Sequence, residues 1–169
     1  MRNLTTAFAT GTAGLILLIG VGCSQEGAGP VAVVDEDSPE FAAMEYRQGL
    51  MEVIAFKAGT IRDMADGNSE VDSDMFTEYA ADLAAVAGMI VEGFVPGSDI
   101  DSLPGSAALP DIWANWDDFL ERAATLEATA QNVADLAATG GFAAGQAAAA
   151  EEIGPACGGC HRNYRQRDE

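Results

Sequence analysis

The sequence predicts an all-α fold, an antiparallel four-helix bundle, for the body of the chain. Apolar residues recur at three- and four-residue intervals through several long segments of similar length. Turn-forming residues separate these segments, and the strict alternation typical of strands is missing from the sequence. Because each segment carries one apolar stripe, only neighbouring helices can bury it, which favours a bundle.

The first helix is expected over residues 39–65. Ser38 is a favourable N-cap, Pro39 suits the first helical position, and Glu40 places a negative charge in the first turn. A turn cluster at 66–68 ends the pattern. The apolar stripe consists of Phe41, Met44, Met51, Ile54, Ala58 and Ile61.

The second helix is expected from a cap at Asp72 to the residue before Pro96. Its apolar residues alternate four- and three-residue steps: Phe76, Ala80, Leu83, Ala87, Ile90 and Phe94. Residues 95–109 are rich in proline, glycine and serine, so they predict a long loop.

The third helix is expected to open at Pro110 and to end at the glycine pair 140–141. Its stripe is the longest in the chain: Ile112, Trp116, Phe119, Ala123, Leu126, Ala130, Val133 and Ala137. The fourth helix begins at Phe142 and continues towards the C-terminus. Pro155 lacks a backbone donor, so we expect it to kink this last helix.

The chain is strongly acidic. Its 169 residues include 27 Asp and Glu against 8 Lys and Arg, a formal net charge of -19. Such a surface repels a phosphate backbone, which excludes nucleic acid as the main partner. Hydrophobic residues make up 49% of the chain, enough to fill a core, so a disordered chain is not expected.

The N-terminus is built like an export signal. Its apolar run from Ala13 to Val21 is well short of the ~20 residues that span a bilayer, so we expect residues 1–22 to be a signal peptide. Residues 23–38 read as a flexible tether, and residues 39–169 as the bundle.

Cys23 follows small residues that resemble a bacterial lipobox, which implies lipid attachment at this thiol. The alternative is an ordinary secretory signal in which Cys23 has no role. Both alternatives place the domain outside the cytoplasm, in the bacterial periplasm, and lipidation would also anchor it to a membrane.

Cys157, Cys160 and His161 form a Cys-x-x-Cys-His motif, the attachment signature of c-type haem. A structural zinc site would have to complete its ligands with carboxylates, and a thioredoxin-like pair would follow a strand. The motif therefore predicts one covalent haem c with His161 as an axial iron ligand. Because His161 is the only histidine, methionine, water or nothing occupies the opposite face.

A haem motif close to the C-terminus of a four-helix bundle resembles the class II cytochromes c, the cytochrome c′ family. Three further local matches support the resemblance across about residues 39–167. They are the Tyr-Arg-Gln run at 46–48, the Pro-Asp-Ile-Trp opening at 110–113, and the Tyr-Arg pair at 164–165.

The resemblance implies roles for seven residues. Cys157 and Cys160 hold the haem, and His161 binds its iron. Met51 caps the distal face, Arg47 and Gln48 contact the haem edge or a propionate, and Arg165 tunes the proximal imidazole. Without the family, core packing explains Met51 equally well, and Arg47 reads as a solvated helix residue. A positive charge at Arg165 is favourable near a helix C-terminus in any protein.

The same resemblance implies two alternative functions, neither of them enzymatic. The first is a five-coordinate haem that binds nitric oxide and carbon monoxide, with electron transfer to redox partner proteins. The second is a low-spin electron carrier similar to cytochrome c-556, in which Met44 or Met51 is the sixth ligand. A homodimer through the first two helices is implied in both cases. A structural bundle with an unrelated cysteine pair is a third, different class.

Overall fold

The computed structural model describes residues 34–167. The expected signal peptide, Cys23 and most of the expected tether lie outside this range. The described helices, in chain order, are α1 (Pro39–Ala65), α2 (Ser73–Ala87), the 3₁₀ turn η1 (Ile90–Gly93), α3 (Asp111–Ala114), α4 (Trp116–Gly140), α5 (Phe142–Ala148), the π turn η2 (Ala149–Ile153) and α6 (Gly154–Tyr164).

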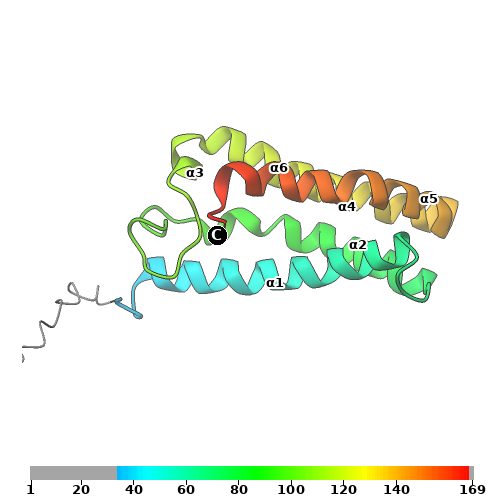
Figure 1. Cartoon of the computed structure of the whole chain (residues 1–169), viewed down its shortest axis with the longest axis horizontal. Coiled ribbons are helices and arrows are strands. Elements are labelled where there is room, and N and C mark those ends of the chain that lie inside the picture. The colour runs from blue at the N-terminus through cyan, green and yellow to red at the C-terminus, as the bar shows by residue number, and fades with distance from the viewer. Residues whose placement is uncertain (1–33, 168–169) are drawn as a thin grey trace, which may run out of the picture. The chain divides into compact units, whose positions relative to one another are not determined.

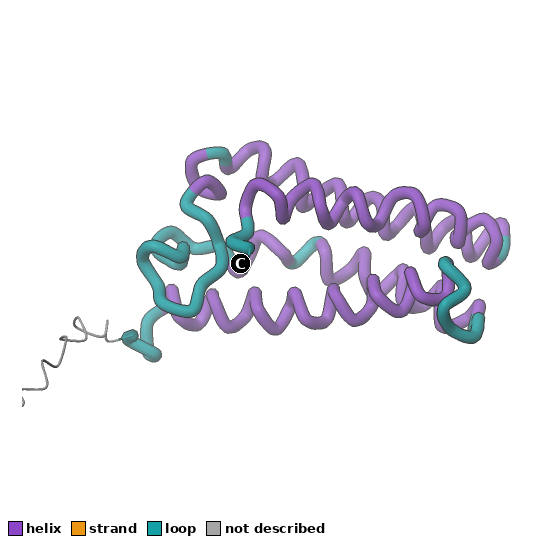
Figure 2. The backbone as a smooth tube through the Cα atoms, viewed as in Figure 1, coloured by secondary structure: helices purple, strands orange, loops and turns teal. Residues whose placement is uncertain are grey.

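These elements form the predicted antiparallel four-helix bundle. Its four arms are α1, α2 with η1, α4, and the continuous run of α5, η2 and α6 (Figures 1 and 2). Helix α2 packs against α1 and α4, and α5 packs against α4. The described residues contain no helix long and apolar enough to cross a membrane.

Helix α1 has the predicted bounds, and the predicted caps of the first two helices are confirmed. The Ser38 hydroxyl accepts a hydrogen bond from the Phe41 amide at 3.2 Å. The Asp72 carboxylate accepts one from the Met75 amide at 2.9 Å. Each cap satisfies an amide that the first helical turn leaves without a partner.

The predicted end of the second helix is wrong. The α-helix stops at Ala87, with Gly88 as its C-cap, and the chain continues as η1 instead of reaching Pro96 in one helix. Glycine supports helix poorly, and the tighter turn brings Gly93 against α1. A Cβ atom at Gly93 would lie 2.6 Å from the Arg47 Cβ, so only glycine fits this contact.

The third helix is interrupted where a continuous helix was predicted. Asn115 leaves the helical region at φ -128° and ψ 45°, which separates the short α3 from α4. Its side-chain amide donates a hydrogen bond to the Asp111 carbonyl at 3.0 Å. Asparagine side chains compete in this way with the backbone for hydrogen bonds.

The expected disturbance near Pro155 takes the form of a π turn. The turn η2 comes directly before α6, and Pro155 is accommodated in the first turn of α6. A proline ring inside an α-helix collides with the carbonyl four residues earlier, and the wider π turn relieves that crowding. Helical structure therefore continues to the cysteine pair.

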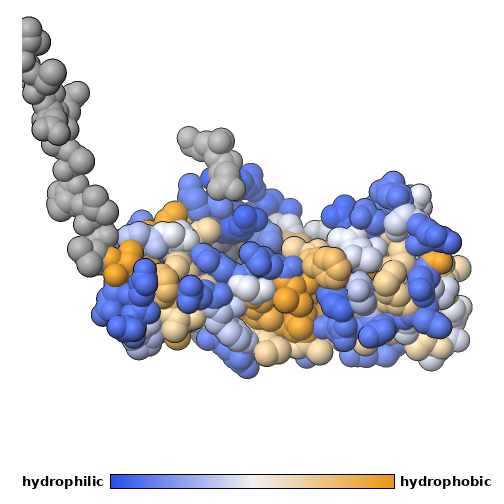
Figure 3. All heavy atoms as spheres, turned by 90° about the horizontal axis from the view of Figure 1, so that it is seen from below, coloured by the Kyte–Doolittle hydropathy of each residue, from blue (hydrophilic) through white to orange (hydrophobic). Residues whose placement is uncertain are grey.

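The core fills the space between the four arms. Its largest fully buried side chains are Phe76, Phe119, Ile61, Met64, Leu83, Ile112, Ile153 and Val133. Burying a side chain of this size contributes about 1.5–3 kcal/mol. Viewed from the α1 side, hydrophobic surface gathers near the middle of the bundle between hydrophilic regions (Figure 3).

Candidate functional site

The cysteine pair and the histidine lie within four residues of one another on α6. Cys157 and Cys160 are free thiols, half-buried against the hydrophobic core. Burial raises the pKa of both thiols, while Arg62 acts to lower that of Cys157 and Arg122 that of Cys160. At neutral pH both cysteines are therefore protonated side chains that face an apolar interior.

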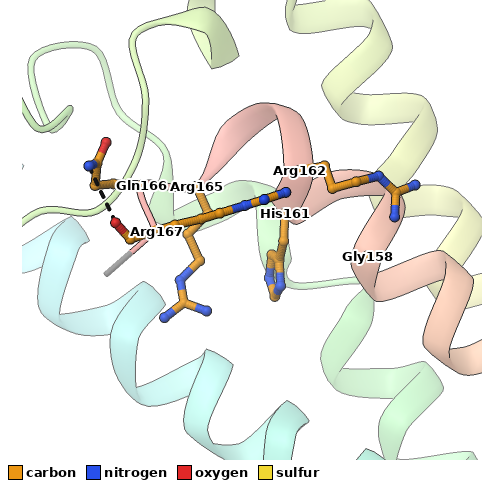
Figure 4. Close-up of a pocket in the computed structure, with 6 residues that line it drawn as sticks. All are labelled: Gly158, His161, Arg162, Arg165, Gln166 and Arg167. Atoms are coloured by element: carbon orange, nitrogen blue, oxygen red, sulfur yellow. Dashed lines mark hydrogen bonds between the residues drawn. The ribbon is translucent and has the colours of Figure 1, made fainter. Parts of the chain in front are cut away.

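The His161 imidazole projects from α6 on the side of α1 (Figure 4). Partial removal from water and the positive charge of Arg165 lower the pKa of this imidazole. Both effects favour the neutral form, which is the form that ligates a metal. His161 and its neighbours line a cavity of about 350 Å³, whose members are Gly158, His161, Arg162, Arg165, Gln166 and Arg167.

Helix α6 packs against the rest of the bundle on one side only. It packs against α4 and α3 but makes no comparable contact with α1 or α2. The inner stripe of α1 includes Ile54 and Ala58, which are buried, and Met51, which is half-buried against the core. The thiols and the imidazole thus belong to a segment that makes little contact with α1, whereas α5 and η2 of the same arm do contact α1.

Arg47 is buried at one end of the bundle and forms hydrogen bonds to η1 and to the loop that follows it. Its guanidinium donates hydrogen bonds to the Gly93 carbonyl at 3.1 Å and to the Ser106 hydroxyl at 2.6 Å. Ser98 accepts two more, at its hydroxyl (2.7 Å) and at its carbonyl (2.5 Å). The guanidinium also lies over the Phe94 ring, 5.2 Å from its centroid. The guanidinium is thus engaged by the loop, and a contact between Arg47 and the haem stays a prediction.

Two other residues of α1 touch the same loop. Gln48 is exposed, and its amide donates a hydrogen bond to the Gly105 carbonyl at 3.1 Å. Met44 is 5% exposed, and its thioether end lies 3.9 Å from where a Gly105 Cβ would be. Met44 and Gln48 are therefore engaged by the loop, whereas Met51 lies further along α1.

Arg165 lies beside His161 and lines the same cavity. The chain is anchored here by an isolated bridge between Arg165 and Ala108. The Leu109 amide donates to the Tyr164 carbonyl at 3.0 Å, and the Gln166 amide donates to the Ala107 carbonyl at 2.8 Å. The end of α6 and the loop before α3 are thus held together, as Figure 1 also shows.

A further group of polar contacts joins α4 to α6. Arg122 on α4 donates to the Gly159 carbonyl, inside the cysteine motif, and pairs with Asp118. The Tyr164 hydroxyl donates to the same carboxylate. The four-residue spacing of Asp118 and Arg122 is a recognisable helix ion pair, but the contact with Gly159 spans 37 positions of sequence and has no local signal.

The site can be tested for its fit to a bound haem. Among the described residues, Trp113 Nε1 is the buried side-chain polar atom without a hydrogen-bond partner. Trp113 belongs to α3, which contacts α6. A buried donor without a partner is costly, and an acceptor on a bound group such as a haem carboxylate would satisfy it. Two free thiols, a neutral imidazole and an unsatisfied donor all fit this group.

A four-helix bundle with this motif on its last helix defines a haem protein of the c type. Comparison with known families agrees, because the family model described as Cytochrome C' matches residues 42–165. This chain belongs to the cytochrome c′ family. The family binds one covalent haem c, and Cys157 and Cys160 are the attachment thiols. When bound, the haem supplies an iron centre that can take a small ligand or exchange an electron.

Relatives with different names match the chain about equally well. Cytochrome c-554 of Cereibacter sphaeroides is 34% identical over 74% of this chain and 93% of its own length. Cytochrome c-556 of Agrobacterium tumefaciens is 35% identical over 72% and 95%. The solved cytochrome c prime of Shewanella frigidimarina has 29% identity and a TM-score of 0.69, covering 76% of this chain and 97% of that one.

A nitric oxide complex of a cytochrome c prime variant from Alcaligenes xylosoxidans also matches, with a TM-score of 0.66. Its identity of 22%, over 76% of this chain and 97% of that one, supports the shared fold alone.

Proposed function

We propose that this protein binds nitric oxide, and secondarily carbon monoxide, at a five-coordinate haem iron held by His161, and that it exchanges electrons with redox partners. One observation carries the proposal: His161 is the only histidine, so no second imidazole closes the opposite face. Met44 contacts the loop at Gly105, whereas Met51 is half-buried further along α1. Met51 is therefore the methionine that we assign to the face of the haem opposite His161.

In this proposal each side chain has a limited task. The neutral imidazole of His161 holds the iron. Burial first, and then the charge of Arg165, lower the pKa of this imidazole and favour that neutral form. Met51 covers the distal face with a flexible apolar side chain, which a small neutral gas displaces more easily than water or an anion does. Gln48 and Arg47 act at the haem edge, with Arg47 also holding the loop. No residue is given a catalytic role.

A low-spin electron carrier is the second candidate function. In this case the Met51 sulfur ligates the iron, closes the sixth position and leaves only electron transfer. Met51 is half-buried on the inner stripe of α1, and a relative of 35% identity is named cytochrome c-556. Met44 could take this role only if its contact with the loop broke.

Optical spectra of the ferrous holoprotein with and without nitric oxide separate the two functions. Gas binding predicts a high-spin spectrum that changes when nitric oxide is added, and a low-spin spectrum unchanged by the gas contradicts it. Met51→Leu removes the sulfur proposed as the sixth iron ligand, so its spectrum should match wild type in the first case and become high-spin in the second. Met44→Leu is the matched control.

We also propose a homodimer through α1 and α2. Two hydrophobic side chains on α1 are unusually exposed, Val53 at 43% and Phe56 at 60%. They lie one turn apart, and hydrophobic surface gathers on this side of the bundle (Figure 3). A second copy would cover such a patch. Sedimentation of wild type and Phe56→Glu checks this: the variant should be monomeric at concentrations where wild type is dimeric.

For residues outside the described range we propose export to the periplasm, with lipid attachment at Cys23. The short apolar run and the small residues before Cys23 support this proposal. Cys23→Ser should move the protein from the membrane to the soluble fraction. An unchanged distribution between these fractions argues for an ordinary signal peptide instead.

A further inference from the structure

Helix α6 is held by a network of side chains on its α4 side. The Arg122 guanidinium pairs with both Asp118 oxygens, at 2.6 Å from Nε and 3.1 Å from Nη2. Its remaining nitrogen, Nη1, donates to the Gly159 carbonyl at 2.8 Å. The Tyr164 hydroxyl completes the network by donating to Asp118, and the Tyr164 ring lies 5.9 Å from the guanidinium. Arg122 therefore links α4 to two points of α6.

Those two points lie on either side of His161. Gly159 precedes the histidine by two residues, and Tyr164 follows it by three. Since α6 makes no comparable contact with α1 or α2, rotation about its own axis is resisted from the α4 side along the cysteine motif and by the loop before α3 at its C-terminal end. Any such rotation would swing the imidazole, which projects towards the α1 side.

The cysteine motif offers α4 few side chains to contact. Gly158 and Gly159 have no side chains, and Cys157 and Cys160 face the core as the haem attachment thiols. A hydrogen bond to a main-chain carbonyl is therefore the contact by which α4 can fix this turn of α6. Arginine suits the task because its planar group can bind a carboxylate with two donors and still present a third.

We propose that Arg122, fixed by Asp118 and Tyr164, is a positioning residue that sets the orientation of the His161 imidazole towards the haem iron. The inference rests on the proposed axial role of His161, but it holds whether the sixth position is open or closed. The Arg122–Asp118 pair is neutral overall, so its contribution is geometric and does not depend on adding a charge near the haem.

The test uses the ferric holoprotein and two readouts. Electron paramagnetic resonance reports the spread of iron ligand geometries, and hydrogen exchange reports the opening of the last turn of α6. Arg122→Ala should broaden or split the resonance of the wild-type protein, and it should raise amide exchange in residues 160–164 about tenfold, as expected for one lost charged hydrogen bond. A single resonance of wild-type width with wild-type exchange overturns the proposal.

A conservative variant and a matched control sharpen the result. Arg122→Lys keeps the charge but cannot present three donors in one plane, so it should resemble Arg122→Ala. Lys57→Ala breaks an ion pair of the same 2.6 Å length between α1 and α2, away from α6. It should leave the resonance unchanged. Rescue by lysine, or equal broadening in Lys57→Ala, overturns the proposal.

If Arg122→Ala fails to fold with haem, Tyr164→Phe decides the question, since it keeps the buried ring and removes one hydrogen bond. Broadening in the same direction supports the proposal, and a wild-type resonance overturns it. The spin state of the wild-type protein tests the gas-binding function separately. The two ideas can therefore fail independently.

Discussion

The Arg47 guanidinium donates hydrogen bonds to both the hydroxyl and the carbonyl of Ser98, which lies 51 residues further along the chain. This contact joins the start of α1 to the long loop before α3. Burial lowers the pKa of Arg47, whereas the charge of nearby Asp99 acts to raise it. The loop at this end of the bundle is thus organised around a buried cation.

Arg47→Ala should destabilise the protein strongly. The substitution leaves the Ser98 carbonyl, the Gly93 carbonyl and the Ser106 hydroxyl without their buried donor. We expect a loss of about 3 kcal/mol in the free energy of unfolding. Denaturant unfolding of the holoprotein measures it, with the exposed Arg162→Ala as control. A loss no greater than that of the control contradicts the role of Arg47 in holding the loop.

Gly93→Ala tests the close approach of η1 to α1. The new methyl group would lie 2.6 Å from the Arg47 Cβ, so the turn or the helix must move. Overpacking of this kind costs about 1–3 kcal/mol. Gly59→Ala on α1, where a Cβ meets nothing within 4 Å, should be neutral or slightly stabilising. Equal thermal stability of the two variants is the result that counts against this contact.

The acid stability of the protein should depend on Asp118. Hydrogen bonds from Arg122 and Tyr164 lower the pKa of this carboxyl below its ordinary value of 3.8. A carboxyl whose pKa is lower in the folded state stabilises the fold above its unfolded pKa, and that contribution disappears as pH falls. Wild type should therefore lose stability below about pH 4 more steeply than Asp118→Asn. Parallel profiles of unfolding free energy against pH exclude this linkage.

The thioether bonds predict how the haem behaves on extraction. Acidified organic solvent should leave all haem with the wild-type protein, because both bonds are covalent. Replacing Cys157 and Cys160 together by serine should release it. His161→Ala should keep the haem attached but lose the wild-type absorption spectrum. Complete release from wild type would falsify covalent attachment.

The sequence predicted those parts of the fold that depend on local patterns. The bounds of α1 follow from a cap, a proline and a regular apolar stripe, and the structure has the same bounds. The breaks at Gly88 and Asn115 were missed because the apolar stripe continues through both positions. A stripe reports which face is buried and does not report whether the backbone stays helical.

The same distinction holds for the site. Cys157, Cys160 and His161 are adjacent in sequence, so their spacing alone indicates haem attachment. Arg47 was identified, but its bonds to the loop depend on residues about 50 positions away. Arg122 was not identified, because nothing near it in the sequence points to α6. Contacts of this kind are set by packing of the whole bundle.

The spin state of the ferric iron tests the central claim most directly. Electron paramagnetic resonance of the wild-type holoprotein at neutral pH, with no added gas, distinguishes an open sixth position from one closed by Met51. A five-coordinate iron held by His161 predicts an axial high-spin signal that is also present in Met51→Leu. A rhombic low-spin signal in wild type, converted to high-spin by Met51→Leu, would contradict the gas-binding function and establish methionine ligation.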